Sequence, residues 1–321
     1  MQLNSDILNT MLAILLPIAL GYFLKLARLF QESEIAALRK FVIRVAVPFL
    51  IFQNLYRADV ESLQQALPII LGFMLMTFLY TLAARLVSPL VAVGKKQQLT
   101  FAFSVFAGNY AFLGWGVIVS FFGVQALPRA VFFSMFFWPV FLICGFFLRR
   151  SQEPGKGEAA GSGFFKVLAR HAGVPIIVAA TALAMNITRL RLPETLNGFV
   201  SQFAALTIPM ILFAIGQNLR LRMPAARLRL VLAASFFRLA GGFALGLAVV
   251  ALLRLFFNLD ILSRQVILLQ SVMPTATMAT FFSEYMAIDE ELLAATIAVS
   301  TLLSFVTLPL WVLVIRVLAR Q

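Results

Sequence analysis

Long apolar stretches, separated by short polar or charged connections, recur along the whole chain. A helix needs about 20 apolar residues to cross the ~30 Å hydrocarbon core of a bilayer. The pattern therefore predicts an all-α, polytopic membrane protein with ten transmembrane helices. The predicted spans are 7–25, 41–56, 64–84, 98–122, 129–148, 172–189, 198–218, 230–253, 264–286 and 292–315.

Gly108 and Asn109 stand at the centre of the fourth predicted span, which reads QLTFAFSVFAGNYAFLGWGVIVSFFG over 98–123. Gly lowers helix stability by ~1 kcal/mol relative to Ala, and Asn forms competing hydrogen bonds with the backbone. In hydrocarbon, a broken backbone survives only where protein or a polar cavity pairs its N–H and C=O groups. We therefore expect Gly108 and Asn109 to form the wall of a cavity.

A polar segment, SQEPGKGEAAGSG over 151–163, divides the predicted spans into two groups of five. Its Gly, Ser, Pro and charge content cannot bury a core. The two groups share sequence features, because VPFLIFQNL in the second span (47–55) is similar to IPMILF followed by QNL in the seventh (208–219). We therefore predict a first five-helix repeat over 1–150, a linker over 151–171 and a second repeat over 172–321.

The ninth predicted span is also interrupted, at Met273-Pro274-Thr275, about where Asn109 falls in the fourth. A proline inside a helix costs ~3 kcal/mol or more. An odd number of helices per repeat inverts the second copy, and interrupted helices at matching positions indicate a transporter site at the midplane. A new half-helix begins after each break, and its positive N-terminal end favours an anion. We therefore expect helices 4 and 9 to cross at their breaks and to bind an anionic substrate there.

Basic residues are distributed unequally between the two ends of the predicted spans. One side carries 16 Lys and Arg and the other 8, so the positive-inside rule places both termini outside the cytoplasm and the linker inside it. The composition agrees with a membrane solvent, with 62% hydrophobic residues, 12% charged residues and a mean hydropathy of +0.96. The net charge of +13 is then explained by topology and contact with membrane lipids rather than by nucleic-acid binding.

Arg238 falls within ~5 Å of the centre of the eighth predicted span, at a ~1.5 Å rise per residue. A charge there costs roughly 3 kcal/mol, so the side chain should face the protein interior. It would either bind a substrate carboxylate or pair with backbone carbonyls of a broken helix, and the sequence leaves both open. Arg44, one turn from Lys40, is expected to snorkel. Trp115 would either line the cavity or mark an interface, and the GxxxG pattern over 242–246 indicates close helix packing.

Several of these stretches resemble one known family. The run AGNYAFLG over 107–114, the pattern around Pro48, and Met273-Pro274-Thr275 followed by Ser283-Glu284-Tyr285 resemble the auxin efflux carrier family, which includes plant PIN-type carriers and bacterial permeases for malate or malonate. The resemblance covers the whole chain. It implies a scaffold made of helices 1, 2, 6 and 7, a mobile transport domain made of helices 3–5 and 8–10, and an organic anion as the cargo.

Two positions depart from that family pattern. Gly108 and Gly116 stand where plant members carry proline. The long plant-type cytosolic loop is absent, so regulation by loop phosphorylation is not implied. The resemblance also implies an elevator-type mechanism, a bacterial inner-membrane location and room for a homodimer through the scaffold helices.

We therefore predict a secondary transporter of a small organic anion, auxin-like or malate- or malonate-like, that works by alternating access without a cofactor or metal. One His, one Cys (Cys144) and no Asp or Glu near a span centre argue against an intramembrane enzyme. The alternatives are an anion channel, since broken helices also line pores, and an inverted-repeat carrier of the bile-acid or sodium–proton antiporter type. The predicted substrate-binding residues are Gly108, Asn109, Tyr110, Trp115, Arg238, Pro274 and Thr275.

Overall fold

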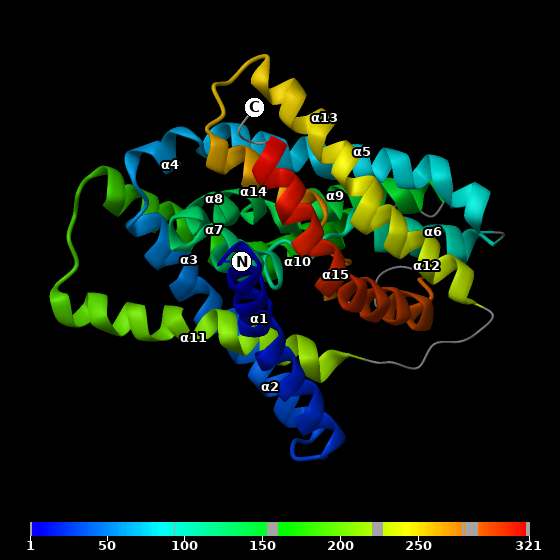
Figure 1. Cartoon of the computed structure of the whole chain (residues 1–321), viewed down its shortest axis with the longest axis horizontal. Coiled ribbons are helices and arrows are strands. Elements are labelled where there is room, and N and C mark those ends of the chain that lie inside the picture. The colour runs from blue at the N-terminus through cyan, green and yellow to red at the C-terminus, as the bar shows by residue number, and fades with distance from the viewer. Residues whose placement is uncertain are drawn as a thin grey trace.

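The computed structural model describes residues 2–92, 94–152, 160–219, 227–277, 279 and 288–318, which are nearly all helical (Figure 1). The helices of the first half are α1 (Gln2–Leu26), α2 (Glu32–Phe41), α3 (Val47–Tyr56), α4 (Val60–Gln64), α5 (Ala66–Val91), α6 (Lys95–Phe106), α7 (Gly114–Phe122), α8 (Leu127–Ser134) and α9 (Phe137–Gln152). Those of the second half are α10 (Ala160–Ile187), α11 (Glu194–Asn218), α12 (Leu228–Phe236), α13 (Gly242–Arg254), α14 (Ile261–Ser271) and α15 (Glu290–Leu318).

Five helical segments are long and apolar enough to cross a membrane, and two shorter helices are also apolar. This confirms a helical membrane protein with several spans, whereas the count of ten and the sidedness of the termini stay predictions. The five segments are Ala66–Val91, Val124–Leu148, Glu194–Gln217, Leu228–Arg254 and Glu290–Leu318, and the shorter ones are Leu12–Leu26 and Gly173–Ile187.

Two π-helical turns join helices into longer rods. Val42–Ala46 connects α2 to α3, and Phe237–Gly241 connects α12 to α13. The predicted spans 41–56 and 230–253 therefore lie within continuous helical stretches, the first of which begins earlier, at Glu32. A π-helical turn adds a residue to one turn and rotates the helix face that follows it.

The interruption predicted in the fourth span is present. Helix α6 ends at Phe106 and α7 begins at Gly114, with non-helical backbone between them. In the ninth span, α14 ends at Ser271 and the chain continues without an α-helix to Thr277. The half-helix expected after that break lies outside the described residues, as does 153–159 of the predicted linker. The rest of the linker predicted over 151–171 is helical, because α9 extends to Gln152 and α10 begins at Ala160.

Small residues let several helices approach each other closely. Helix α1 packs on α11, where a Cβ atom added to Gly21 would stand 2.2 Å from the Phe213 carbonyl oxygen. A Cβ atom on Gly246 would stand 2.4 Å from Ser271 Oγ, and one on Gly242 would overlap the Tyr80 hydroxyl. The predicted packing role of the 242–246 motif is therefore confirmed.

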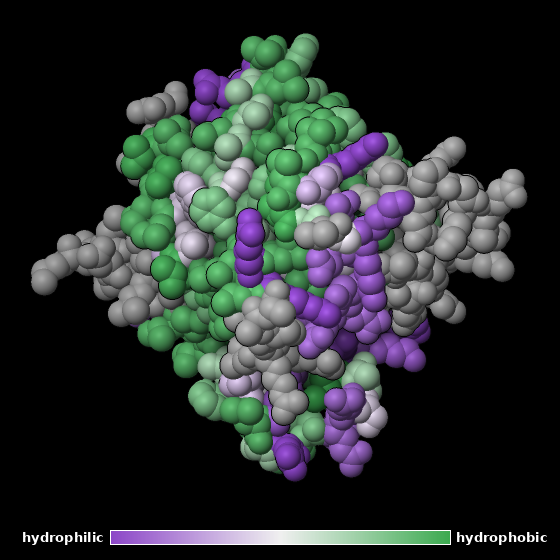
Figure 2. Space-filling model, turned by 90° about the vertical axis from the view of Figure 1, so that its right-hand side faces the viewer, coloured by the Kyte–Doolittle hydropathy of each residue, from purple (hydrophilic) through white to green (hydrophobic). Residues whose placement is uncertain are grey.

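The outer surface of the described residues is rich in large apolar side chains, such as Leu90 at 80% exposure and Phe256 at 75%. Figure 2 looks onto the end of the molecule where α5 ends and α6, α12 and α15 begin. In that view hydrophobic residues cover one side and the top of the surface, and hydrophilic side chains gather in a band beside them. This distribution suits flanks in contact with lipid and an end in contact with water.

Candidate functional site

The two interrupted segments lie against each other and pair through their backbones. The Asn109 N–H donates to the Pro274 carbonyl at 2.8 Å, and the Ala276 N–H donates to the Ala107 carbonyl at 2.7 Å. Gly108 and Thr275 form an isolated antiparallel bridge between these bonds. The short ladder satisfies backbone groups that the two helix breaks leave unpaired, which is the condition for such breaks in a membrane protein.

Arg238 joins the ends of the two half-helices that lead into these breaks. Its side chain is fully buried, Nε donates to the Met273 carbonyl at 2.7 Å, and Nη1 donates to the Val105 carbonyl at 3.3 Å. These carbonyls lie at the C-terminal ends of α14 and α6, where a cation is favourable. The guanidinium also lies over the rings of Tyr80 and Tyr110, at 4.2 and 5.1 Å from their centroids. This geometry favours the structural interpretation of Arg238.

The Arg238 guanidinium explains why position 108 holds glycine in this chain. A Cβ atom on Gly108 would stand 1.9 Å from Arg238 Nη2 and 2.5 Å from two carbons of the Tyr110 ring. No side chain, and therefore no proline, fits there while both neighbours keep their positions. The departure from the plant pattern at this position thus has a local steric cause.

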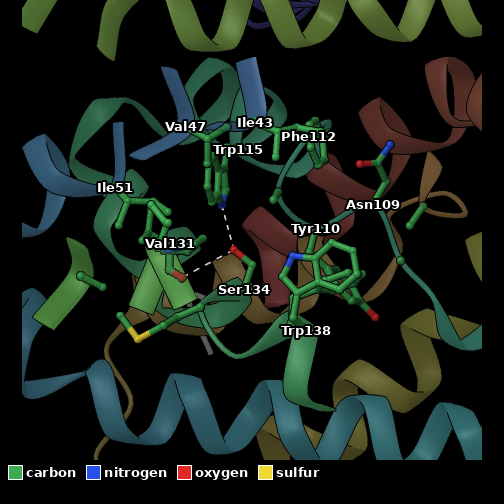
Figure 3. Close-up of a pocket in the computed structure, with 18 of the residues that line it drawn as sticks. Ile43, Val47, Ile51, Asn109, Tyr110, Phe112, Trp115, Val131, Ser134 and Trp138 are labelled. Carbon is green, nitrogen blue, oxygen red and sulfur yellow. Dashed lines mark hydrogen bonds between the residues drawn. The ribbon is translucent and has the colours of Figure 1, made fainter. Parts of the chain in front are cut away.

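A cavity of about 430 Å³ opens beside the crossing (Figure 3). The non-helical segment 108–112 forms one wall, and residues of α7, α8 and α9 form the next. Residues of the α2–α3 rod and of α10 close the other side. The lining residues are Ile43, Arg44, Val47, Ile51, Gly108, Asn109, Tyr110, Ala111, Phe112, Trp115, Val131, Ser134, Met135, Phe137, Trp138, Val174, Pro175, Ala179 and Ala276.

Asn109 lines this cavity and carries a buried hydrogen-bond donor that has no acceptor among the described residues. Its Oδ1 accepts from the Leu113 N–H at 3.2 Å, which fixes the orientation of the amide. Its Nδ2 is buried and has no acceptor among the described residues. A buried donor without a partner costs about 1–3 kcal/mol, so the arrangement suits a ligand with an oxygen acceptor.

Arg44 is the one charged residue among the described residues that line the cavity. It lies in the π-helical turn Val42–Ala46, and its side chain is exposed. On a helix, positions 44, 47 and 51 share a face, and Val47 and Ile51 also line the cavity. The sequence suggested snorkelling for Arg44, and the structure places this exposed residue among those that line the cavity.

Trp115 forms part of the cavity wall, which was one of its two interpretations. Its Nε1 donates to Ser134 Oγ at 3.0 Å (Figure 3). It also donates to the Ala130 carbonyl at 3.2 Å, so the indole is fixed in place. Trp138 lines the same cavity. The aromatic walls are therefore more extensive than the sequence indicated.

The remaining predicted site residues lie behind the cavity. Thr275 is fully buried, its Oγ1 donates to the Ser104 carbonyl at 2.8 Å, and its N–H donates to Ser300 Oγ at 3.2 Å. Ala276, the next residue, lines the cavity, whereas Pro274, Thr275 and Arg238 do not. The structure thus brings Gly108, Asn109, Tyr110 and Trp115 to the cavity and leaves the other three in the crossing.

The half-helix N-terminus at α7 offers less to an anion than the sequence suggested. The N–H groups of Leu113, Gly114 and Trp115 are already bonded, to Asn109 Oδ1, the Asn109 carbonyl and the Ala111 carbonyl. The corresponding start after the second break lies outside the described residues. The expected pair of converging positive helix ends therefore stays a prediction, and Arg44 is the charged residue among the described lining residues.

Comparisons with known proteins identify the family of this chain. The membrane transport protein family matches residues 6–312. The chain is 29% identical over 317 residues to an uncharacterized transporter of Methanothermobacter thermautotrophicus. The matched region covers 96% of this chain and 98% of that protein. The chain is 24% identical over 311 residues to an uncharacterized transporter of Methanocaldococcus jannaschii, covering 95% and 97%. The resemblance drawn from the sequence motifs is confirmed, and the chain belongs to the auxin efflux carrier family of membrane transport proteins.

Proposed function

We propose that this protein is a secondary transporter that carries a small organic anion across the membrane by alternating access. The observation that carries the proposal is the cavity beside the crossing, which combines one cationic side chain, Arg44, with the unpaired amide donor of Asn109. Backbone breaks at membrane depth are tolerated where they line such a cavity. The proposal includes ten spans in two inverted five-helix repeats.

The position of the cavity supports a carrier that moves one group of helices against another. Arg44 comes from the α2–α3 rod, which with α10 belongs to the scaffold in the proposed architecture. Asn109 and Trp115 come from the interrupted α6–α7 segment, which belongs to the transport domain. A substrate held between these two groups would change its access when one group moves relative to the other.

The cavity chemistry favours a monocarboxylate with an apolar body. Its volume falls in the range of ~300–1,000 Å³ that small-molecule sites occupy. Tyr110, Phe112, Trp115 and Trp138 supply flat apolar walls, and the lining has a single cation. A second carboxylate would be desolvated without a cationic partner among the described lining residues, which is costly. An aromatic or other apolar monocarboxylate therefore fits better than malate or malonate.

The test is uptake and binding with purified protein in proteoliposomes. Phenylacetate and indole-3-acetate should bind and be transported in preference to malonate and malate. Arg44→Gln should weaken binding of the best anion by ~10-fold or more, the loss expected for a charge-assisted hydrogen bond. Lys40→Gln is the matched control, because Lys40 lies one turn away on the same rod and does not line the cavity. Equal affinities of wild type and Arg44→Gln would contradict the site.

A counterflow assay separates the carrier from the anion channel. A carrier preloaded with unlabelled substrate should accumulate labelled substrate transiently, and its initial rate should saturate with concentration. A channel would do neither, because it lets ions pass without an alternating conformational step. Linear, counterflow-free flux would replace the carrier with the channel while leaving the anion site in place.

A further inference from the structure

Two arginines at the junction of α13 and α14 border a second cleft, of about 470 Å³, apart from the cavity at the crossing. Arg254 ends α13, Arg264 lies in the first turn of α14, and residues 255–259 of the connection complete the lining. Two fixed positive charges therefore border one small cleft.

Neither arginine is neutralised by a carboxylate of the described residues. In the part of the chain that the structure describes, Arg129 and Arg227 form ion pairs, whereas Arg254 and Arg264 form none. Asp260, the acid in the same connection, already receives hydrogen bonds from Arg129 and from the Ser263 N–H. Arg264 Nε is shielded from solvent and has no acceptor among the described residues. The cleft therefore offers positive charge and unmet donors to an anion.

The cleft lies at the depth expected for lipid headgroups. The segment Leu228–Arg254 is long and apolar enough to cross a membrane, and Arg254 is its last residue. Leu255 and Phe256, which line the same cleft, are 74% and 75% exposed. Exposed apolar side chains next to cations at the end of a span suit an amphiphile, whose chains contact the apolar residues while its headgroup meets the charges.

We propose that the cleft between Arg254 and Arg264 binds the phosphate of an anionic phospholipid headgroup. A guanidinium presents parallel N–H groups that match two phosphate oxygens, and two such groups can share one phosphate. A headgroup with net negative charge is preferred over a zwitterionic one, because the latter brings a positive group close to the arginines. Leu255 and Phe256 favour a lipid over free phosphate as the source of that group.

The test measures unfolding of the full-length protein in detergent after addition of phosphatidylglycerol or phosphatidylcholine. A ligand that binds only the folded state raises its melting temperature. Phosphatidylglycerol should raise it in the wild type, and the affinity read from its concentration dependence should fall at least ~10-fold in Arg254→Gln/Arg264→Gln. Arg191→Gln is the control, because Arg191 is an exposed arginine of another interhelical connection, between α10 and α11.

Each outcome bears on the proposal. An equal effect of phosphatidylglycerol on the wild type and the double variant, or an equal effect of phosphatidylcholine and phosphatidylglycerol on the wild type, would overturn it. Inorganic phosphate and glycerol 3-phosphate are tested in parallel. If either raises the melting temperature as much as the lipid does, and only when both arginines are present, the cleft is reassigned to a soluble phosphate. Arg254→Gln alone should lose part of the affinity for phosphatidylglycerol. Because Arg254 is exposed, this single variant keeps the test decisive if the double variant fails to fold.

Discussion

The crossing and the cavity beside it share a wall but differ in how their arginines are held. In the crossing, backbone groups pair across the two breaks, and Arg238 donates to two carbonyls while fully buried. In the cavity, Arg44 is exposed and Asn109 Nδ2 has no acceptor among the described residues. Arg238 Nη2 also has no acceptor among the described residues, so the regions differ in the backbone pairs of the crossing and in the exposure of their arginines. An exposed arginine beside a cavity can meet a ligand, whereas a buried one that donates to carbonyls holds the structure together.

The two arginines make this contrast sharp. Arg238 lies near the centre of a predicted span and Arg44 close to a predicted end, so depth alone points to Arg238 as the functional residue. The contacts reverse that order. Arg238 lies behind the cavity wall, and Arg44 lines the cavity. Substitution of each arginine should therefore affect different properties, and the predictions below measure that difference.

The largest effect is expected from Arg238→Met, which keeps much of the side-chain volume and removes the guanidinium. The Met273 and Val105 carbonyls would lose their donor, so we expect a loss of about 2–4 kcal/mol in stability from two unpaired buried groups. Thermal and denaturant unfolding in detergent measures it. Arg44→Met is the control and should unfold like the wild type. Unchanged stability of Arg238→Met with lost anion binding would instead make Arg238 a ligand contact.

A smaller loss is expected from Gly108→Ala. The added methyl group would overlap Arg238 Nη2 and the Tyr110 ring, and overpacking of this kind costs about 1–3 kcal/mol. Gly94→Ala is the matched control, because a Cβ atom there meets nothing within 4 Å. The cost should be smaller in the Arg238→Met background, since one of the two clashes is then gone. Fully additive losses would show that the guanidinium does not set the requirement for glycine.

The breaks could be predicted from sequence because their causes are local. Gly108-Asn109 and Met273-Pro274-Thr275 weaken a helix wherever they stand, and the membrane then demands partners for the freed backbone. A further signal was missed. Pro139 cannot donate to the Met135 carbonyl, and the fifth predicted span is interrupted between α8 and α9 at 135–136, beside the cavity.

The roles of the arginines could not be predicted in the same way. Arg238 bonds carbonyls that lie 35 and 133 positions away, and no periodicity in the sequence encodes such pairs. Arg44 lies in a π-helical turn, which shifts the register of the helix face by a residue that the hydrophobic pattern does not reveal. The sequence therefore predicted the two breaks, whereas the set of residues that line the cavity beside them, Arg44 included, became visible only in the structure.

Asn109→Ala should separate binding from folding. It removes the free Nδ2 donor, which should weaken binding of the anion by ~3- to 10-fold for one hydrogen bond, and transport should fall with it. It also removes the Leu113 N–H acceptor, a loss of about 1 kcal/mol in stability. Asn54→Ala is the control, because the Asn54 amide bonds within its own helix, to the Leu50 carbonyl, and does not line the cavity. Normal uptake kinetics by well-folded Asn109→Ala protein would remove Asn109 from the site.

The smallest effect concerns the contacts of Arg129, a second buried arginine, which does not line the cavity. Arg129 bonds Ser62, Ser263 and Asp260 and so ties α4, α8 and the start of α14 together. Burial of Asp260 opposes its ionisation, but hydrogen bonds from Ser263 and Arg129 outweigh this and hold its pKa below the ordinary value.

A carboxyl group whose pKa is lower in the folded state stabilises the fold above its unfolded pKa, ~3.9 for Asp, and loses that contribution as the pH falls. The melting temperature of the wild type should therefore change little above about pH 5 and decline below about pH 4, as Asp260 becomes protonated. The decline should be shallower in Asp260→Asn. An anion-binding measurement over the same range should show no matching step, because Asp260 does not line the cavity. A decline in Asp260→Asn as steep as in the wild type would assign the acid sensitivity to other carboxyl groups, Asp59 first among them. Burial opposes the ionisation of Asp59, but hydrogen bonds from Ser62 and the nearby charge of Arg129 outweigh it, so its pKa is also lowered.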